Sequence, residues 1–230
     1  MSATAINLSP SDLRFWQTTV GKKAIMAVTG VILCGFVMGH LIGNLQIFLL
    51  PDAINNYSAA LKAMPALLWS ARIVLLVAVM LHIWSALQLA RLQAAARPVR
   101  YVKKVNADST YASRTMMWSG PILLAFIIFH LLHFTFGTIH PGGRFDAHNV
   151  YNNVVTGFQV WPVSLFYIIA MLMLCYHLYH GLWSMLQTLG ISHPVYTPWL
   201  RTIAKVIAVA IFLGEISMPI AVLAGFIKPV

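Results

Sequence analysis

Five long apolar runs with almost no charge constrain this sequence of 230 residues more than any other feature. Each run is long enough to cross the roughly 30 Å hydrocarbon core of a bilayer as a helix. With 60% hydrophobic and only 9% charged residues, the chain lacks the surface charge of a soluble domain, so soluble enzyme folds are excluded. The sequence predicts an all-α integral membrane protein, one membrane domain over residues 1–230 with five transmembrane helices in a bundle. The predicted spans are approximately 24–50, 67–89, 116–138, 160–186 and 203–226.

The segments between the spans differ in composition. Residues 1–23 are charged and lack the short apolar core of a signal peptide, so we expect a retained cytoplasmic arm. Residues 52–65 are more polar and fit a short helix at the membrane surface. Residues 91–114 form a solvated basic loop, and residues 140–159, rich in Pro, Gly and Asn, predict a turn-rich connection. Residues 193–201 link the last two spans.

Lys and Arg are divided unevenly between the two sides of these spans, and cytoplasmic loops normally carry the excess. One side holds Arg14, Lys22, Lys23, Arg91, Arg97, Arg100, Lys103, Lys104, Arg114, Arg201 and Lys205. The other side holds only Lys62, Arg72, Arg144 and Lys228. We therefore expect a multi-pass protein of the cell's inner (cytoplasmic) membrane, with its amino terminus inside and its carboxyl terminus outside.

The formal net charge of +10 indicates contact with anionic membrane lipid or acidic partners. No basic stretch is interleaved with aromatic residues as in nucleic-acid grooves, so no nucleic-acid partner is expected. With only 5 Asp and Glu residues, paired-carboxylate hydrolysis and carboxylate metal cages are also disfavoured. Cys34 and Cys175 lie within apolar spans and predict no disulfide.

Histidines recur inside the predicted spans, where an ionisable side chain is costly. They are His40 in the first span, His82 in the second, His130 and His133 in the third, and His177 and His180 in the fourth. A lone histidine of this kind is most simply explained by a hydrogen bond across a helix interface. Four successive spans with at least one each favour haem iron instead, because facing imidazoles can occupy both axial positions in a helical bundle. No C-x-x-C-H motif is present, so a haem would be held without thioether bonds.

Depth in the membrane sorts four of these histidines into two levels. Counting ~1.5 Å per residue from the cytoplasmic end of each span, His40 and His130 lie at roughly 21 to 24 Å, and His82 and His177 at roughly 14 to 15 Å. The two ligands of one iron must lie at the same depth. We therefore predict two stacked haems, an outer one held by His40 and His130 (the outer pair) and an inner one held by His82 and His177 (the inner pair).

Several residues near these pairs keep two interpretations. Spacing alone does not choose between His130 and His133 or between His177 and His180. His133 and His180 can bond loops, haem propionates or a quinone, or simply pack between helices, which is the simpler explanation. Glu215, the only carboxylate within a span, either serves proton transfer or faces a polar cavity. Four cations at membrane boundaries can pair with haem propionates or extend to lipid headgroups; they are Lys22, Lys23, Arg72 and Arg114.

Small residues accompany His40 along the first span. Gly35, Gly39 and Gly43 repeat every fourth residue on the face that His40 shares within a turn. Such a stripe permits close approach of another group, and ordinary helix packing explains it equally well.

Four local strings resemble the cytochrome b subunit of succinate dehydrogenase and fumarate reductase, in its five-helix, two-haem form. They are GKKAIMAVTGVILCGFVMGHLIGNL, LHIWSALQLAR, RTMMWSGPILLAFIIFHLLHF and YHLYHGLWSMLQTLGISHP, in the family's order and over essentially the whole chain. The resemblance implies His40, His82, His130 and His177 as axial ligands, with the first span paired to the third and the second to the fourth. Cys175 stands two residues before His177, where some members have a glutamate, so a proton route through an acid there is not expected.

The resemblance implies a membrane anchor of respiratory complex II, the succinate dehydrogenase of the tricarboxylic acid cycle. Its cofactors would be two haem b groups. Its partners would be a flavoprotein (FAD) subunit, an iron–sulfur subunit and menaquinone or ubiquinone, with a possible higher oligomer of the complex. Electrons would pass from succinate to the quinone, or in reverse to fumarate. The chain itself would carry no dehydrogenase active site, and no catalytic residue for the quinone is assigned.

Three other classes compete with this assignment. A cytochrome b of the bc type places two ligands on each of two helices half a membrane apart, and no span here shows that pattern. A haem-free transporter or channel would use the histidines as a proton relay. A purely structural anchor would hold no haem.

Overall fold

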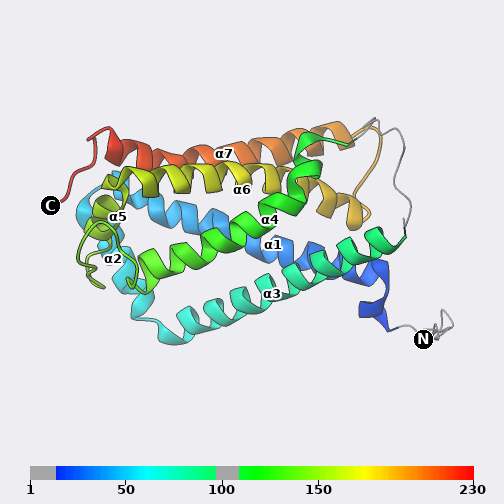
Figure 1. Ribbon diagram of the computed structural model, residues 1–230, viewed down its shortest axis with the longest axis horizontal. Helices are drawn as coiled ribbons and strands as arrows, with labels where there is room; N and C mark the ends of the chain where they lie inside the picture. Colours follow the sequence, from blue (N-terminus) through cyan, green and yellow to red (C-terminus); the bar gives the residue numbers. More distant parts are fainter. Residues whose placement is uncertain (1–13, 97–108) are drawn as a thin grey trace.

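The computed structural model describes residues 14–96 and 109–230, which form helices and no strand. Five helices are long and apolar enough to cross a membrane, which confirms the predicted all-α membrane fold. They run along the long axis of the bundle, and α1 begins at the end opposite the carboxyl terminus (Figure 1). These helices are α1 (Thr19–Asn44) with its extension η3 (Leu45–Phe48), α3 (Pro65–Ala95), α4 (Tyr111–His130) with η4 (Leu131–Thr135), α6 (Trp161–Thr188) and α7 (Thr197–Leu223).

Most of these helices extend past the apolar runs that predicted them. The first begins at Thr19, because the Thr18 side chain caps it by accepting a hydrogen bond from the amide of Gly21 at 2.9 Å. Similarly, α3 continues through Arg91 to Ala95. A search for uncharged residues stops at the first Lys or Arg, whereas a long cationic side chain can extend to water while its helix continues. Most of the predicted basic loop, residues 97–108, lies outside the described residues.

Two short helices cover the end of the bundle where the carboxyl terminus lies, α2 (Pro51–Lys62) and α5 (Val150–Gln159) (Figure 1). The predicted short helix at 52–65 is present as α2. The predicted turn-rich connection is wrong over α5, because the Asn149 side chain accepts a hydrogen bond from the Asn152 amide at 3.0 Å and starts a helix. The two helices are joined by the Tyr151 amide, which donates to Asn55 at 3.0 Å.

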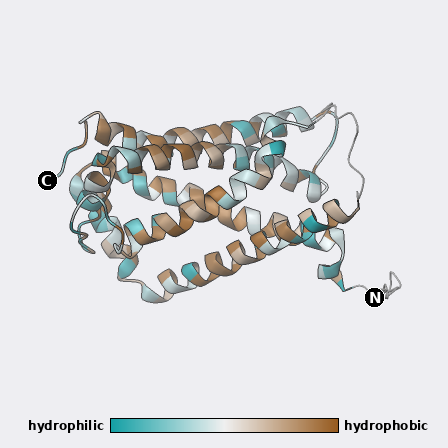
Figure 2. Cartoon of the chain, viewed as in Figure 1, coloured by the Kyte–Doolittle hydropathy of each residue, from teal (hydrophilic) through white to brown (hydrophobic). Residues whose placement is uncertain are grey.

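Apolar side chains cover the outside of the bundle as well as its interior. The middle of each long helix is hydrophobic and the ends are more polar (Figure 2), as expected for a protein whose solvent is lipid. Inside, one buried cluster lies at the α2 and α5 end and includes Val155, Phe158 and Tyr167. A second lies between α1, α6 and α7 and includes Leu41 and Leu178.

The glycine stripe on α1 serves close packing at one position only. A Cβ atom at Gly43 would lie 2.7 Å from Cε1 of Tyr57, so the ring of α2 approaches the backbone there. A Cβ atom at Gly35 or Gly39 would meet no other atom within 4 Å. At Gly35 and Gly39 the space beside the helix is open, so close approach of another group stays a prediction there.

Candidate functional site

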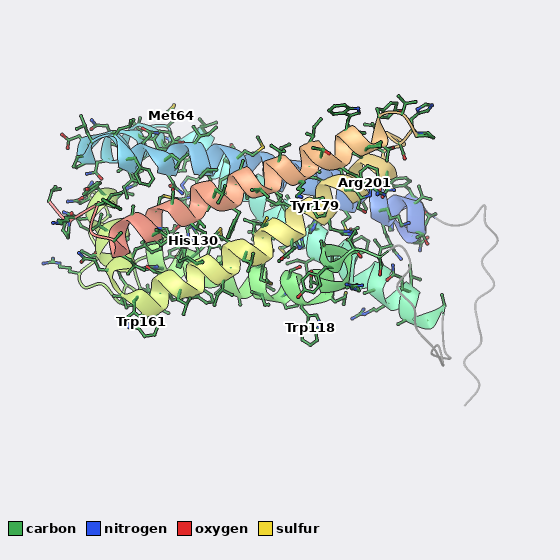
Figure 3. All side chains as sticks on the ribbon, turned by 90° about the horizontal axis from the view of Figure 1, so that it is seen from above. Met64, Trp118, His130, Trp161, Tyr179 and Arg201 are labelled. Carbon is green, nitrogen blue, oxygen red and sulfur yellow. The ribbon has the colours of Figure 1, made fainter. Side chains whose placement is uncertain are left out.

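The outer pair lies side by side in the bundle. The ring centroids of His40, on α1, and His130, at the end of α4, are 5.7 Å apart, and the ring planes are perpendicular. Figure 3 shows His130 inside the bundle, whereas Trp118 and Trp161 project away from it. The structure thus places the His40 ring of the first span beside the His130 ring of the third, the two residues that depth counting matches.

The inner pair has the same arrangement on the other two helices. The ring centroids of His82, on α3, and His177, on α6, are 6.2 Å apart, with the planes at 51°. His82 reaches α1 at Thr29, which lies about 16 Å from His40 along that helix at ~1.5 Å per residue. Two histidine pairs therefore occur at two separate levels of one bundle.

Small hydroxyl groups bind the Nδ1 atoms of the inner pair. Thr29 Oγ1 lies 3.2 Å from Nδ1 of His82, and Ser119 Oγ lies 3.2 Å from Nδ1 of His177. The Thr29 hydroxyl already donates to the carbonyl of Ile25 at 2.8 Å, so it is an acceptor for the imidazole. A neutral ring that donates from Nδ1 keeps a lone pair on Nε2, the form that coordinates a metal.

The outer pair is held differently. Nδ1 of His130 lies 3.3 Å from the hydroxyl of Tyr167, on α6. The His40 ring stacks on Phe36 with centroids 5.3 Å apart and planes at 17°. Within residues 14–96 and 109–230 we find no hydrogen bond to the His40 ring. Three of the four histidines thus have an oriented Nδ1 atom, and the fourth is positioned by ring stacking.

The ring spacing of both pairs is compatible with two imidazoles that hold one haem iron. An imidazole nitrogen lies about 2 Å from a bound metal, so two rings on opposite sides of one iron have centroids about 6 Å apart. The observed values are 5.7 and 6.2 Å. The helices that carry each pair are not packed against one another, since α1 packs on α3 and α6, and α4 packs on α6. In the described part of the chain, no group of three or more His, Cys, Asp or Glu side chains is arranged to hold a metal ion.

The four predicted propionate partners have different environments. Lys22 is buried near the start of α1, with 8% of its surface exposed. The other three are exposed: Lys23 follows it, Arg72 lies over the ring of Trp69 at 5.0 Å, and Arg114 lies over Tyr111 at 5.9 Å. Of these four cations only Lys22 is buried, so it is the strongest candidate to pair with a group inside the bundle.

The other residues singled out in the sequence are two further histidines, one glutamate and two cysteines, and they lie at buried or partly buried positions. His133 is fully buried and bonds Tyr167 on α6, a contact between helices. His180 on α6 and Glu215 on α7 are half-buried. Cys34 and Cys175 are free, as predicted.

Sequence reasoning missed three residues of the site, namely Thr29, Ser119 and Tyr167. Each is a hydroxyl-bearing residue in an apolar span, and a polar side chain there needs a hydrogen-bond partner. That rule marks such residues as candidates. It does not say which histidine each one meets, because the contacts join residues 34 or more positions apart in the chain, on different helices.

Comparison with known proteins gave no further assignment. No protein-family model matches the chain, no curated protein is significantly similar to it, and no solved structure matches it.

Proposed function

We propose that this chain is a dihaem cytochrome b, the membrane-anchor subunit of a succinate:quinone oxidoreductase that can also run as a quinol:fumarate reductase. One observation carries the proposal. Two histidine pairs, each from helices that are not packed together, lie at two levels with the ring spacing of bis-imidazole ligation. The four sequence strings around these histidines support the choice of this family over other dihaem cytochromes.

In this proposal, His40 and His130 hold the outer haem and His82 and His177 the inner one. Thr29 and Ser119 would orient the inner rings by accepting from Nδ1, which leaves the Nε2 lone pair free to hold a metal. When bound, the two haems supply one-electron transfer between a partner subunit and membrane quinone, with potentials tuned by the protein. Lys22, Lys23, Arg72 and Arg114 are the available cations for propionates.

The first test is the haem content of the chain purified in mild detergent. Reduced-minus-oxidised spectra and total haem should show two b haems per chain. His82→Ala and His40→Ala should each remove one haem and leave the band of the other. His193→Ala is the matched control, because His193 is exposed in the α6–α7 connection, and it should retain both haems. A wild-type protein without a Soret band would refute the proposal and favour a haem-free transporter or structural anchor.

The second test concerns the partners. We expect a flavoprotein subunit and an iron–sulfur subunit to copurify with the chain and to bind on its positively charged side. The complex should reduce quinone with succinate. Two haems without either partner would keep the dihaem cytochrome and refute the succinate:quinone assignment.

A further inference from the structure

His130, Tyr167 and His133 form a hydrogen-bonded chain that has no counterpart at the inner pair among the described residues. The Tyr167 hydroxyl lies 3.3 Å from Nδ1 of His130 and 3.1 Å from Nδ1 of His133. The phenol oxygen has two lone pairs and one proton, so it can bond both rings at once. Tyr167 therefore connects a candidate ligand to a second histidine that is not one.

The His133 side chain makes one hydrogen bond to the described residues, the bond to this hydroxyl. Its side chain is fully buried, and its Nε2 atom has no hydrogen-bond partner. Burying a polar ring with one nitrogen unpaired costs free energy, so its remaining bond must matter to the structure. A π-helical turn at η4, where the Phe136 amide bonds the Leu131 carbonyl, widens the helix at this residue.

Gly157 on α5 leaves the space that His133 needs. A Cβ atom there would lie 2.7 Å from Nε2 of His133 and 2.9 Å from its Cε1 atom. A real Cβ atom does not approach so closely, so any larger residue would push the imidazole back toward Tyr167. The α5 backbone thus supports His133, which in turn holds the Tyr167 hydroxyl.

Aromatic packing fixes the Tyr167 ring itself. It is 6% exposed, and it meets Phe126 and Phe158 edge-to-face with centroids 5.1 and 5.0 Å apart. Phe129 and Phe134 pack on it at 6.1 and 5.8 Å. A ring held on several sides can present its hydroxyl in one place only.

We propose that Tyr167, held by His133 against Gly157, is a positioning residue that orients His130 and raises its basicity as an iron ligand. The inference rests on the proposed function, since it takes His130 as a ligand through Nε2. In that state the imidazole proton is on Nδ1 and is donated to the Tyr167 oxygen. A ligand that donates in this way supplies more electron density to the iron, which favours the oxidised state and lowers the potential of the outer haem.

Potentiometric titration of the purified dihaem protein tests this directly. Tyr167→Phe keeps the ring and removes the hydroxyl, so the outer haem should shift to a higher potential while the inner haem stays unchanged. The expected change in the oxidised-to-reduced ratio approaches tenfold, about 59 mV for one electron. The outer haem is identified as the one missing from His40→Ala. Tyr151→Phe is the matched control, because that buried hydroxyl donates to the Lys228 carbonyl instead, and it should move neither potential.

Two variants of His133 test the connection without altering Tyr167. His133→Leu removes the bond and should shift the outer potential in the same direction by less. His133→Asn places an amide near the Nδ1 position and should restore the wild-type value. If Tyr167→Phe does not fold, this pair decides the matter by itself, with the shift and its rescue supporting the proposal and their absence overturning it.

The results separate the two proposals. Two haems in the wild type with no shift in Tyr167→Phe, or with equal shifts of both haems, would overturn the role of Tyr167 and leave the dihaem assignment intact. A wild-type protein without haem would overturn both.

Discussion

The outer and inner histidine pairs have nearly the same spacing but different surroundings. His130 lies among the rings of Phe126, Phe134 and Tyr167, with centroids 5.6 to 6.0 Å away, at the end of the bundle that α2 and α5 cover. The inner rings are each held by one small hydroxyl, from Thr29 and from Ser119. A pair of histidines can thus be held either within an aromatic cluster, as at the outer level, or by single hydrogen bonds, as at the inner level. Under the proposed function, identical ligands at the two levels therefore need not have identical potentials.

The largest effect should follow from replacing the second histidine of either pair, His130 or His177. His130→Ala should remove the same haem as His40→Ala, and His177→Ala the same haem as His82→Ala, because either change removes one of the two imidazoles that hold the same iron. Low-temperature reduced-minus-oxidised spectra distinguish the two bands. Loss of different bands within a pair would show that the rings are matched otherwise.

A smaller effect should distinguish the hydroxyl groups of the inner pair. Thr29→Val and Ser119→Ala each remove one acceptor with little change of volume, and loss of such a partner typically weakens metal retention by roughly 10-fold or more. Haem release during gel filtration in detergent measures this for each band. Only the inner haem should become labile, and equal loss of the outer haem would contradict the separation into two levels. Thr156→Val is a suitable control, since its hydroxyl bonds the Asn152 carbonyl and His140 instead.

A still smaller effect should come from glycines, because the space beside them differs between the outer and the inner level. A Cβ atom at Gly214 would lie 2.8 Å from Cδ1 of buried Leu41, beside His40, so Gly214→Ala should destabilise the fold by about 1 to 3 kcal/mol. A Cβ atom at Gly30 would lie 3.6 Å from Cε1 of His82, an ordinary contact, so Gly30→Ala should change stability by no more than about 0.5 kcal/mol. Thermal unfolding in detergent measures both. A larger loss in Gly30→Ala would show that the inner level is the tighter one.

The smallest effect should be a dependence on acid in the segment that closes the outer end. Burial lowers the pKa of His140, whose ring lies 5.0 Å from that of His133. The folded segment therefore binds fewer protons than the unfolded one, so its stability is present at neutral pH and falls as the pH drops below the ordinary value of about 6.5. The protection factors of the amides in residues 137–149, which compare each exchange rate with the intrinsic rate at the same pH, should fall between pH 7 and 5. His140→Asn should remove this dependence, and an unchanged profile in that variant would exclude His140 as its source.

Some parts of the structure could be predicted from the sequence because they depend on local chemistry. Long apolar runs must become helices in lipid, where every backbone amide and carbonyl needs an internal partner, so the five spans followed directly. Helix boundaries and α5 were less accessible. They depend on caps such as Thr18 and Asn149, which a count of uncharged residues does not detect.

The candidate site shows the same division. Depth along a helix is a linear property of the sequence, so counting residues was enough to match His40 with His130 and His82 with His177. Rotation about each helix axis and contacts between helices are not linear properties. This is why the sequence left the role of His133 open and showed nothing of Tyr167 or Gly157 as its neighbours.

The sequence by itself determined that this chain spans a membrane five times and carries histidines at two heights, because hydrophobicity and rise per residue are set locally. Only the tertiary structure decided which hydroxyls bond His82, His130 and His177, which glycines meet a neighbouring ring, and which histidine pair lies within an aromatic cluster. Those features arise where separate helices meet, and side chains far apart in the chain become neighbours only after the bundle has packed.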